Sequence, residues 1–175
     1  LGSSSAFMVG LVNALFALEG KLASKYEIAS IAAKIEIDIL GRKIGKQDHF
    51  ACCYGNVNNL IFKSNENVII NPIVASPEVI KKLENNMILL YTNQKRNSES
   101  VLKNQYKIKK NQFEELKRMR DLVKISRNMI LNKNFNIKKF GNLLDKNWQI
   151  KKEINKFSSN NLIDNYYKTA IRNGA

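Results

Sequence analysis

Two hydrophobic periods alternate along this chain, and their order limits the folds open to it. Apolar residues recur with helical spacing from Ser4 to Leu18, from Ser24 to Leu40 and through much of the second half. In between, residues 59–63 and 68–74 have strand-like composition, and the polar residues 64–67 join them in a hairpin-type connection. The order predicts an α+β fold whose second half is dominated by helices.

The first helix is apolar almost all round, so we expect it to be buried. A glycine-bounded turn follows the second helix, and a short helix is predicted from about Gln47 to Tyr54, where Gly55 ends it. Further on, Pro77 opens another short helix, and residues 87–92 form an apolar run of strand length. Helical spacing then marks three segments, which begin near residues 113, 137 and 159.

The formal net charge of the 175 residues is +14, which could attract phosphates of nucleic acids, membranes or nucleotides. Lys, Asn and Ile are abundant throughout, however, and the basic residues alternate with Glu and Asn on helix surfaces. We therefore interpret the charge as solvated helix faces and expect neither nucleic acid nor membrane as a partner. A basic helical nucleic-acid-binding module remains the alternative from another class of protein.

The cysteines and the termini add two expectations about the context of the chain. Cys52 and Cys53 are adjacent, which does not suit a low-strain disulfide, and we expect a reducing, cytoplasmic location. The apolar stretch from Phe7 to Leu18 is too short to span a bilayer. Because the chain starts at Leu1 in front of a helix and stops at Ala175 without a closing element, we expect it to be a fragment.

Small residues at the start of the first helix form one candidate site. The segment Gly2-Ser3-Ser4-Ser5 leads directly into the helix, whose first N–H groups and partial positive charge can bind phosphate. A serine hydroxyl there can also bind a phosphate-bound Mg²⁺ ion. The alternative is that the serines are ordinary N-caps.

Two acidic residues and a Cys–His group form the other candidate sites. Phosphoryl transfer needs one carboxylate near Mg²⁺ and one that faces the acceptor hydroxyl, and Glu36 and Asp48 could fill these roles. The alternative makes Glu36 a solvated helix residue and Asp48 a helix cap. His49, Cys52 and Cys53 share one helical face, where core packing is a simpler interpretation than zinc binding or a Cys–His nucleophile.

Taken in order, these segments resemble the GHMP kinases, and most of all the D-glycero-D-manno-heptose 7-phosphate kinase group. The resemblance spans essentially the whole chain, and its strength lies in the ordered set of motifs. The matching segments are Leu1-Gly2-Ser3-Ser4-Ser5, Ile35-Glu36-Ile37, Gly45-Lys46-Gln47-Asp48, Tyr54-Gly55, Leu89-Leu90-Tyr91-Thr92-Asn93-Gln94-Lys95-Arg96, Gly141-Asn142-Leu143-Leu144, Trp148-Gln149-Ile150-Lys151-Lys152 and Asn173-Gly174-Ala175. One departure is His49, which stands where the sugar kinases usually have Gln.

The resemblance implies a role for each candidate residue. Asp48 would be the catalytic carboxylate that faces the sugar hydroxyl, and Ser4 and Glu36 would bind Mg²⁺. The ATP phosphates would bind at Gly2, Ser3, Ser4 and Ser5. Substrate-loop residues would be Tyr54, Gly55, Thr92 and Arg96.

The resemblance also implies the architecture and the reaction. The fold would be a two-domain GHMP kinase-like α+β fold, here without the N-terminal strands and the C-terminal glycine-rich motif. Residues 1–83 would end the N-terminal, ATP-binding domain, and residues 84–175 would form part of the C-terminal domain. With ATP and Mg²⁺, the full-length enzyme would phosphorylate a hydroxyl of a sugar phosphate, with D-glycero-D-manno-heptose 7-phosphate as the expected acceptor, whereas the fragment alone would be inactive. Fucose, galactose or a non-sugar alcohol as acceptor, or a relative that has lost catalysis, are the alternatives within the family.

Overall fold

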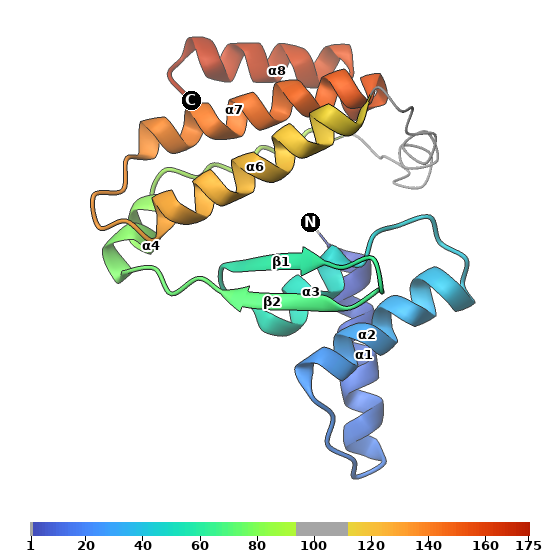
Figure 1. Cartoon of the computed structure of the whole chain (residues 1–175). Helices are drawn as coiled ribbons and strands as arrows, with labels where there is room; N and C mark the ends of the chain where they lie inside the picture. The colour runs from blue at the N-terminus through green and yellow to red at the C-terminus, as the bar shows by residue number, and fades with distance from the viewer. Residues whose placement is uncertain (1, 94–111) are drawn as a thin grey trace. The chain divides into compact units, whose positions relative to one another are not determined.

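The structure is a computed structural model that describes residues 2–93 and 112–175, apart from the side chain of Lys156. It divides into two compact units, Leu1–Ile73 and Val74–Ala175 (Figure 1). The sequence predicts a division near residue 83, whereas the structure divides between Ile73 and Val74. The short helix that begins at Pro77 therefore lies in the second unit rather than the first. The assignment of the two parts to kinase domains stays a prediction.

The first unit begins with three helices, α1 (Ser3–Leu18), α2 (Lys25–Lys34) and α3 (Gln47–Tyr54). Ser24 caps α2, since its side chain accepts a hydrogen bond from the backbone N–H of Glu27 at 3.1 Å. The second predicted helix does run on past α2, but as a wider π-helical turn over Ile35–Ile39. Such turns occur often at functional sites.

An antiparallel hairpin completes the first unit, as predicted. Strand β1 (Asn58–Phe62) pairs with β2 (Val68–Pro72), and Leu60 lies opposite Ile70. In the connecting turn Glu66 adopts a positive φ of 68°, and its backbone carbonyl accepts a hydrogen bond from Lys46 Nζ at 2.8 Å. Lys46 therefore ties the tip of the hairpin to the start of α3.

Helix α2 lies at the centre of the first unit and packs on two sides. Val12 of α1 meets Ile28 and Ala32 of α2 in one buried cluster. Phe50 of α3 and Val68 of β2 form a second buried cluster with α2. Alanines on α2 let its neighbours approach closely, and this packing fixes α1, α3 and the hairpin around one helix.

The prediction that α1 is buried is wrong. Phe7 is 70% exposed and Leu18 is 83% exposed, whereas Val12 is only 3% exposed. Within the described part of the first unit, α1 packs against α2 and α3, and two neighbouring helices cover only one side of a helix. An apolar pattern on all sides of a helix therefore does not predict how many of its sides other elements cover.

The second unit is helical. Its elements are α4 (Pro77–Glu84), α6 (Phe113–Ile130), α7 (Ile137–Ile154), a 3₁₀ turn (Lys156–Ser158) and α8 (Asn161–Arg172). Polar side chains cap three of the helices, because Ser76, Asn136 and Asn160 accept hydrogen bonds from first-turn N–H groups. Within this unit α7 lies between α6 and α8 (Figure 1).

A polar pair joins α7 to α8. The Tyr167 hydroxyl donates a hydrogen bond to Asp145, and the rings of Tyr167 and Trp148 lie 6.1 Å apart. Burial, together with the bond to Asp145 and the charge of that carboxylate, raises the pKa of Tyr167 to about 12. The pair therefore stabilises the packing of α8 as long as Tyr167 keeps its proton.

The apolar run at residues 87–92 does not form a strand. Ile88 is almost fully exposed, and the run has no strand partner among the described residues of its unit. Without a neighbouring strand, the run cannot form the inter-strand backbone hydrogen bonds of a sheet. With helices in both units and one small sheet, the predicted α+β class is nevertheless confirmed.

Candidate active site

The start of α1 is built from residues with little or no side chain. Gly2 occupies the N-cap position with a left-handed φ of 66°, and its carbonyl accepts the Ala6 N–H at 2.8 Å. No side chain caps this helix. The alternative interpretation of the serines as N-caps is therefore wrong, because Ser3, Ser4 and Ser5 lie within the first turn. The first-turn amides and the helix dipole are oriented to bind an anion here.

Glu36 is buried against this helix start. Its side chain is only 1% exposed, which rules out the alternative that it is a solvated helix residue. The Ser4 hydroxyl donates a hydrogen bond to Glu36 Oε1. Glu36 lies in the π-helical turn that follows α2, so this contact joins that turn to the start of α1.

Arg42 closes the outer side of the Ser4–Glu36 pair. Its Nη1 lies 2.6 Å from Glu36 Oε1 and 2.8 Å from Ser4 Oγ. Burial alone would raise the pKa of the Glu36 carboxyl, but hydrogen bonds from Ser4 and His49 and the nearby positive charge of Arg42 lower its pKa below the ordinary value. Glu36 is therefore ionised at neutral pH. Arg42 was not predicted as a site residue, because it lies beyond the helix in a glycine-bounded turn and carries no motif of its own.

His49 supports Glu36 from the inner side. The ring is fully buried, and its Nε2 lies 2.8 Å from Glu36 Oε2. The other ring nitrogen, Nδ1, has no hydrogen-bond partner among the described residues. The bond between His49 and Glu36 ties α3 to the π-helical turn. The sequence offered one signal for this role, namely that His49 replaces the Gln usual in the sugar kinases.

The cysteines next to His49 do not complete a metal site. The described residues contain no group of three His, Cys, Asp or Glu side chains placed to hold a metal ion. Cys53 is half-buried and packs in the core, as predicted, but Cys52 is exposed, so the expectation that it packs in the core is wrong. The reason is helical geometry, which points adjacent residues in directions about 100° apart.

Asp48 lies beside the start of α1. A Cβ atom added at Gly2 would lie 3.4 Å from Cβ, Cγ and Oδ2 of Asp48. Asp48 is exposed in the first turn of α3, where Lys46 is the N-cap residue and no side chain makes a capping hydrogen bond. The alternative that Asp48 serves as a helix cap is therefore wrong. Its carboxylate and the Ser4–Glu36 pair thus lie around the same helix start.

Of the four predicted substrate-loop residues, the structure places Tyr54 and Gly55 in the same unit as this helix start. Tyr54 lies at the other end of α3 and packs against the cluster around Phe50. Gly55, which follows it, has a φ of 64° and ends the helix. Thr92 belongs to the second unit, and Arg96 lies outside the described residues.

The oxygen atoms around Ser4 fit a magnesium ion that arrives with a nucleotide. Mg²⁺ prefers oxygen ligands and in nucleotide sites is held by one or two protein side chains together with phosphate oxygens and water. Ser4 and Glu36 offer a hydroxyl and an ionised carboxylate that already touch each other. The first-turn amides of α1 lie next to them, where phosphate oxygens could bind.

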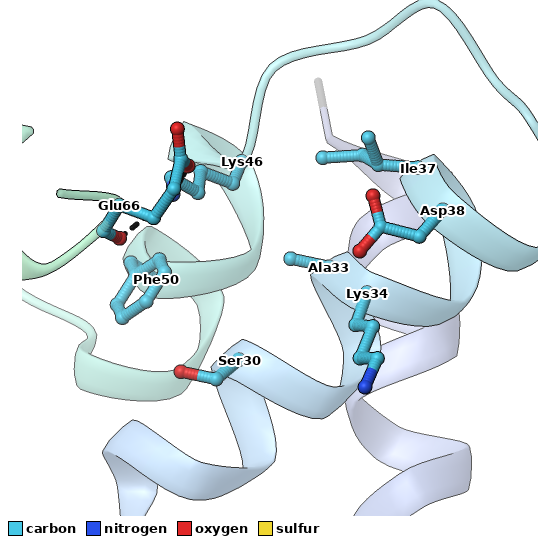
Figure 2. Close-up of a pocket in the computed structure, with 8 residues that line it drawn as sticks. All are labelled: Ser30, Ala33, Lys34, Ile37, Asp38, Lys46, Phe50 and Glu66. Carbon is cyan, nitrogen blue, oxygen red and sulfur yellow. Dashed lines mark hydrogen bonds and ion pairs between the residues drawn. The ribbon is translucent and has the colours of Figure 1, made fainter. Parts of the chain in front are cut away.

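A surface hollow lies beside α2, away from the Ser4–Glu36 pair. It has a volume of about 270 Å³ and lies between α2, the start of α3 and the hairpin turn (Figure 2). Ser30, Lys34 and Ile37 line it with helical spacing, and Lys46 and Glu66 close it with their ion pair (Figure 2). Glu36 does not line this hollow, which is therefore distinct from the Ser4–Glu36 contact at the start of α1.

Comparison with known proteins finds relatives that are named as kinases. Residues 1–56 match the family described as "GHMP kinases N terminal domain". The chain is 32% identical over 179 aligned residues to the D-glycero-alpha-D-manno-heptose 7-phosphate kinase of Campylobacter jejuni. The alignment covers all of this chain and 52% of that kinase. A bifunctional fucokinase/GDP-fucose pyrophosphorylase of Arabidopsis thaliana is 25% identical over 96% of this chain and 16% of its own length. The chain thus spans about half the length of the first of these relatives and less of the second.

A solved structure shares the fold. The D-glycero-D-manno-heptose 1-phosphate kinase from Bacteroides thetaiotaomicron matches with a TM-score of 0.68 and 27% identity, over 87% of this chain and 44% of that one. No helix in the described part of the present chain is both long and apolar enough to cross a membrane. The resemblance expected from the sequence is therefore confirmed, since residues 1–56 match the GHMP kinase N-terminal domain family and the chain is similar to heptose phosphate kinases.

Proposed function

We propose that the protein containing this chain transfers the γ-phosphoryl group of ATP to a hydroxyl of a sugar phosphate. One observation carries the proposal. Ser4 hydrogen bonds to the buried Glu36, and Asp48 lies against Gly2 at the same helix start. An anion-binding helix terminus, a hydroxyl and an ionised carboxylate as metal ligands, and a second, exposed carboxylate are the parts that phosphoryl transfer needs.

The chain's own residues would bind and orient the nucleotide. The first-turn amides of α1 would donate hydrogen bonds to phosphate oxygens, and the lack of a side chain at Gly2 leaves room for them. Ser4 and Glu36 would hold Mg²⁺, which when bound supplies positive charge to the phosphates. His49 would keep the Glu36 carboxylate in place through its 2.8 Å contact with Oε2.

Asp48 would act on the acceptor. Its carboxylate would orient the sugar hydroxyl and accept its proton while the hydroxyl oxygen forms a bond to the γ-phosphorus. The bond between that phosphorus and the β–γ bridging oxygen breaks, and ADP leaves with the electron pair. The products are ADP and a sugar bisphosphate. Since Asp48 is exposed beside the helix start, an acceptor can reach it.

The names of two relatives support a heptose phosphate as the acceptor. The Campylobacter jejuni relative is named as a kinase of heptose 7-phosphate, and the solved structure as a kinase of heptose 1-phosphate. We take D-glycero-D-manno-heptose 7-phosphate as the first acceptor to test. The Arabidopsis thaliana relative is named as a fucokinase. Fucose is therefore the second acceptor to test, together with other sugars and a non-sugar alcohol.

A transfer assay with γ-labelled ATP tests the proposal. The intact protein is incubated with Mg²⁺ and, in separate reactions, heptose 7-phosphate, fucose, galactose and a non-sugar alcohol. Label transfer to heptose 7-phosphate with the highest kcat/KM supports the proposal. If label is transferred only to another acceptor, that acceptor replaces heptose 7-phosphate as the proposed substrate. If no acceptor is labelled and ATP binding is undetectable, the kinase function is contradicted.

A further inference from the structure

The guanidinium of Arg42 contacts the same two oxygens that a cation bound to both Ser4 and Glu36 would contact. A single atom, Nη1, lies 2.8 Å from Ser4 Oγ and 2.6 Å from Glu36 Oε1. These are the two oxygens that the proposed function assigns to Mg²⁺. Arg42 therefore acts as a tethered cation at the same pair of ligands.

The local backbone holds Arg42 in this position. The N–H of Arg42 donates to the carbonyl of Glu36 at 3.0 Å, so the residue is attached to the π-helical turn that carries Glu36. Gly41, just before it, has a φ of 64°, which a residue with a side chain rarely adopts. The turn thus directs the Arg42 side chain back over the carboxylate.

Arg42 and a metal ion exclude each other at these oxygens. Magnesium binds oxygen at about 2.0–2.1 Å, so an ion bonded to Glu36 Oε1 would lie within about 5 Å of Nη1. Two cations at that separation repel each other strongly in a partly buried site. The Arg42 side chain is 43% exposed and, among the described residues, makes side-chain hydrogen bonds only to Ser4 and Glu36, so it can swing into solvent.

We propose that Arg42 is a built-in counter-ion that neutralises Glu36 in the metal-free protein and that a divalent cation must displace. This inference rests on the proposed function, because that function places the metal at Ser4 and Glu36. Its consequence is a metal site that stays closed by an ion pair until a divalent cation competes for it. Arg42 is neither a catalytic residue nor a metal ligand in this account.

Mn²⁺ binding followed by electron paramagnetic resonance gives a readout that does not depend on turnover. In the intact protein at constant ionic strength, Arg42→Gln should lower the Kd for Mn²⁺ by about three- to tenfold, since it removes the competing ion pair. The matched control Lys43→Gln removes the same formal charge from the neighbouring exposed residue. It should change the Kd by less than about twofold.

Thermal unfolding provides an independent second measurement. Arg42→Gln should lower the melting temperature of the metal-free protein, and saturating Mg²⁺ should remove most of that loss, because a metal-bound protein no longer uses the Arg42 contact. Arg42→Lys keeps a positive charge at the site and should bind Mn²⁺ more like the wild type than Arg42→Gln does. An Arg42→Gln protein with unchanged or weaker Mn²⁺ affinity overturns the inference.

Glu36→Gln separates this inference from the proposed function. If Glu36→Gln abolishes Mn²⁺ binding while Arg42→Gln leaves the Kd unchanged, the metal site stands and the role of Arg42 is wrong. If Glu36→Gln leaves Mn²⁺ binding intact with and without an ATP analogue, the metal site itself is wrong. If no variant binds Mn²⁺ under either condition, both proposals are overturned.

Discussion

The hydroxyl of Ser4 is hydrogen bonded to the carboxylate of Glu36, although the two residues are 32 positions apart in the chain. This contact joins the start of α1 to the π-helical turn after α2. His49 extends it to α3, since its Nε2 lies 2.8 Å from the other carboxylate oxygen. Three separate segments therefore meet at one buried carboxylate, and the predictions below test that arrangement.

Glu36→Gln should destabilise the protein at neutral pH by about 2–4 kcal/mol, because it removes the charge that the surrounding donors neutralise. The folded protein lowers the pKa of Glu36, so this contribution is present above the ordinary carboxyl pKa of about 4.3 and is lost as the pH falls through the lower folded value. Urea unfolding followed by circular dichroism at pH 7 and pH 3 measures the difference, which should shrink at pH 3.

Glu19→Gln is the control for that experiment. Glu19 also pairs with a cation, Lys21, but both side chains are more than 60% exposed. An exposed pair contributes little, so the control should change the free energy of unfolding by less than about 1 kcal/mol. Equal effects of the two substitutions would show that the burial of Glu36 has no energetic role.

His49→Gln should keep more activity than His49→Leu. A glutamine amide can still donate a hydrogen bond to Glu36, whereas leucine leaves the buried carboxylate oxygen without this partner. We expect His49→Leu to raise the Mg²⁺ concentration needed for half-maximal turnover by about tenfold and His49→Gln by much less. Equal Mg²⁺ dependence of the two variants would mean that His49 only fills space.

The sequence predicted most elements but not the contacts that make the site. Periodicity located α1, α3, the hairpin and the long helices, because each has a clear apolar pattern or a glycine or proline boundary. The roles of Arg42 and His49 depend on which segments meet in space. A single sequence does not contain that information when the partners are Ser4 and Glu36, far away along the chain.

Local pattern also failed where burial depends on neighbours. The apolar run at residues 87–92 has the length of a strand, yet nothing in the described part of its unit pairs with it. In the same way, α1 is apolar on more sides than α2 and α3 cover. Hydrophobicity measures what a segment could bury, whereas packing partners decide what it does bury.

Cys52 should react with a thiol reagent faster than Cys53. Cys52 is exposed and borders the same surface hollow as Gly2 and Asp48. Cys53 is half-buried, and burial raises the pKa of its thiol, which leaves less of the reactive thiolate. Mass spectrometry after limited iodoacetamide treatment should find Cys52 modified first, with Mg·ATP slowing that reaction.

Cys52→Ser provides the control, since it should remove the fast phase of modification and leave the slow one. Fast modification of Cys53 would contradict its burial in the core, and a Cys52 rate that saturating Mg·ATP does not change would contradict the placement of the nucleotide beside α3.

Tyr167→Phe should destabilise the second unit by about 1 kcal/mol, because it removes the hydrogen bond to Asp145 and keeps the ring. With its pKa raised to about 12, Tyr167 contributes this stability fully below the ordinary tyrosine value of about 10. The contribution is lost as the pH rises through about 12. Absorbance at about 295 nm should show a late step in the tyrosine titration of the folded wild type, and this step should be smaller in the variant.

Tyr166→Phe is the matched control on the same helix. Tyr166 is 41% exposed, so its substitution should leave the late titration step and the free energy of unfolding nearly unchanged. If Tyr166→Phe removes the late step instead, Tyr166 rather than Tyr167 contacts Asp145.

The most direct test of the central claim compares Asp48→Asn with the wild type in the intact protein, with turnover of γ-labelled ATP and heptose 7-phosphate measured beside the Kd for ATP. If Asp48 accepts the hydroxyl proton beside the Ser4–Glu36 pair, the variant should lose at least about 10²-fold in kcat, while its Kd for ATP changes by less than about threefold. Turnover at the wild-type rate in Asp48→Asn would contradict the account.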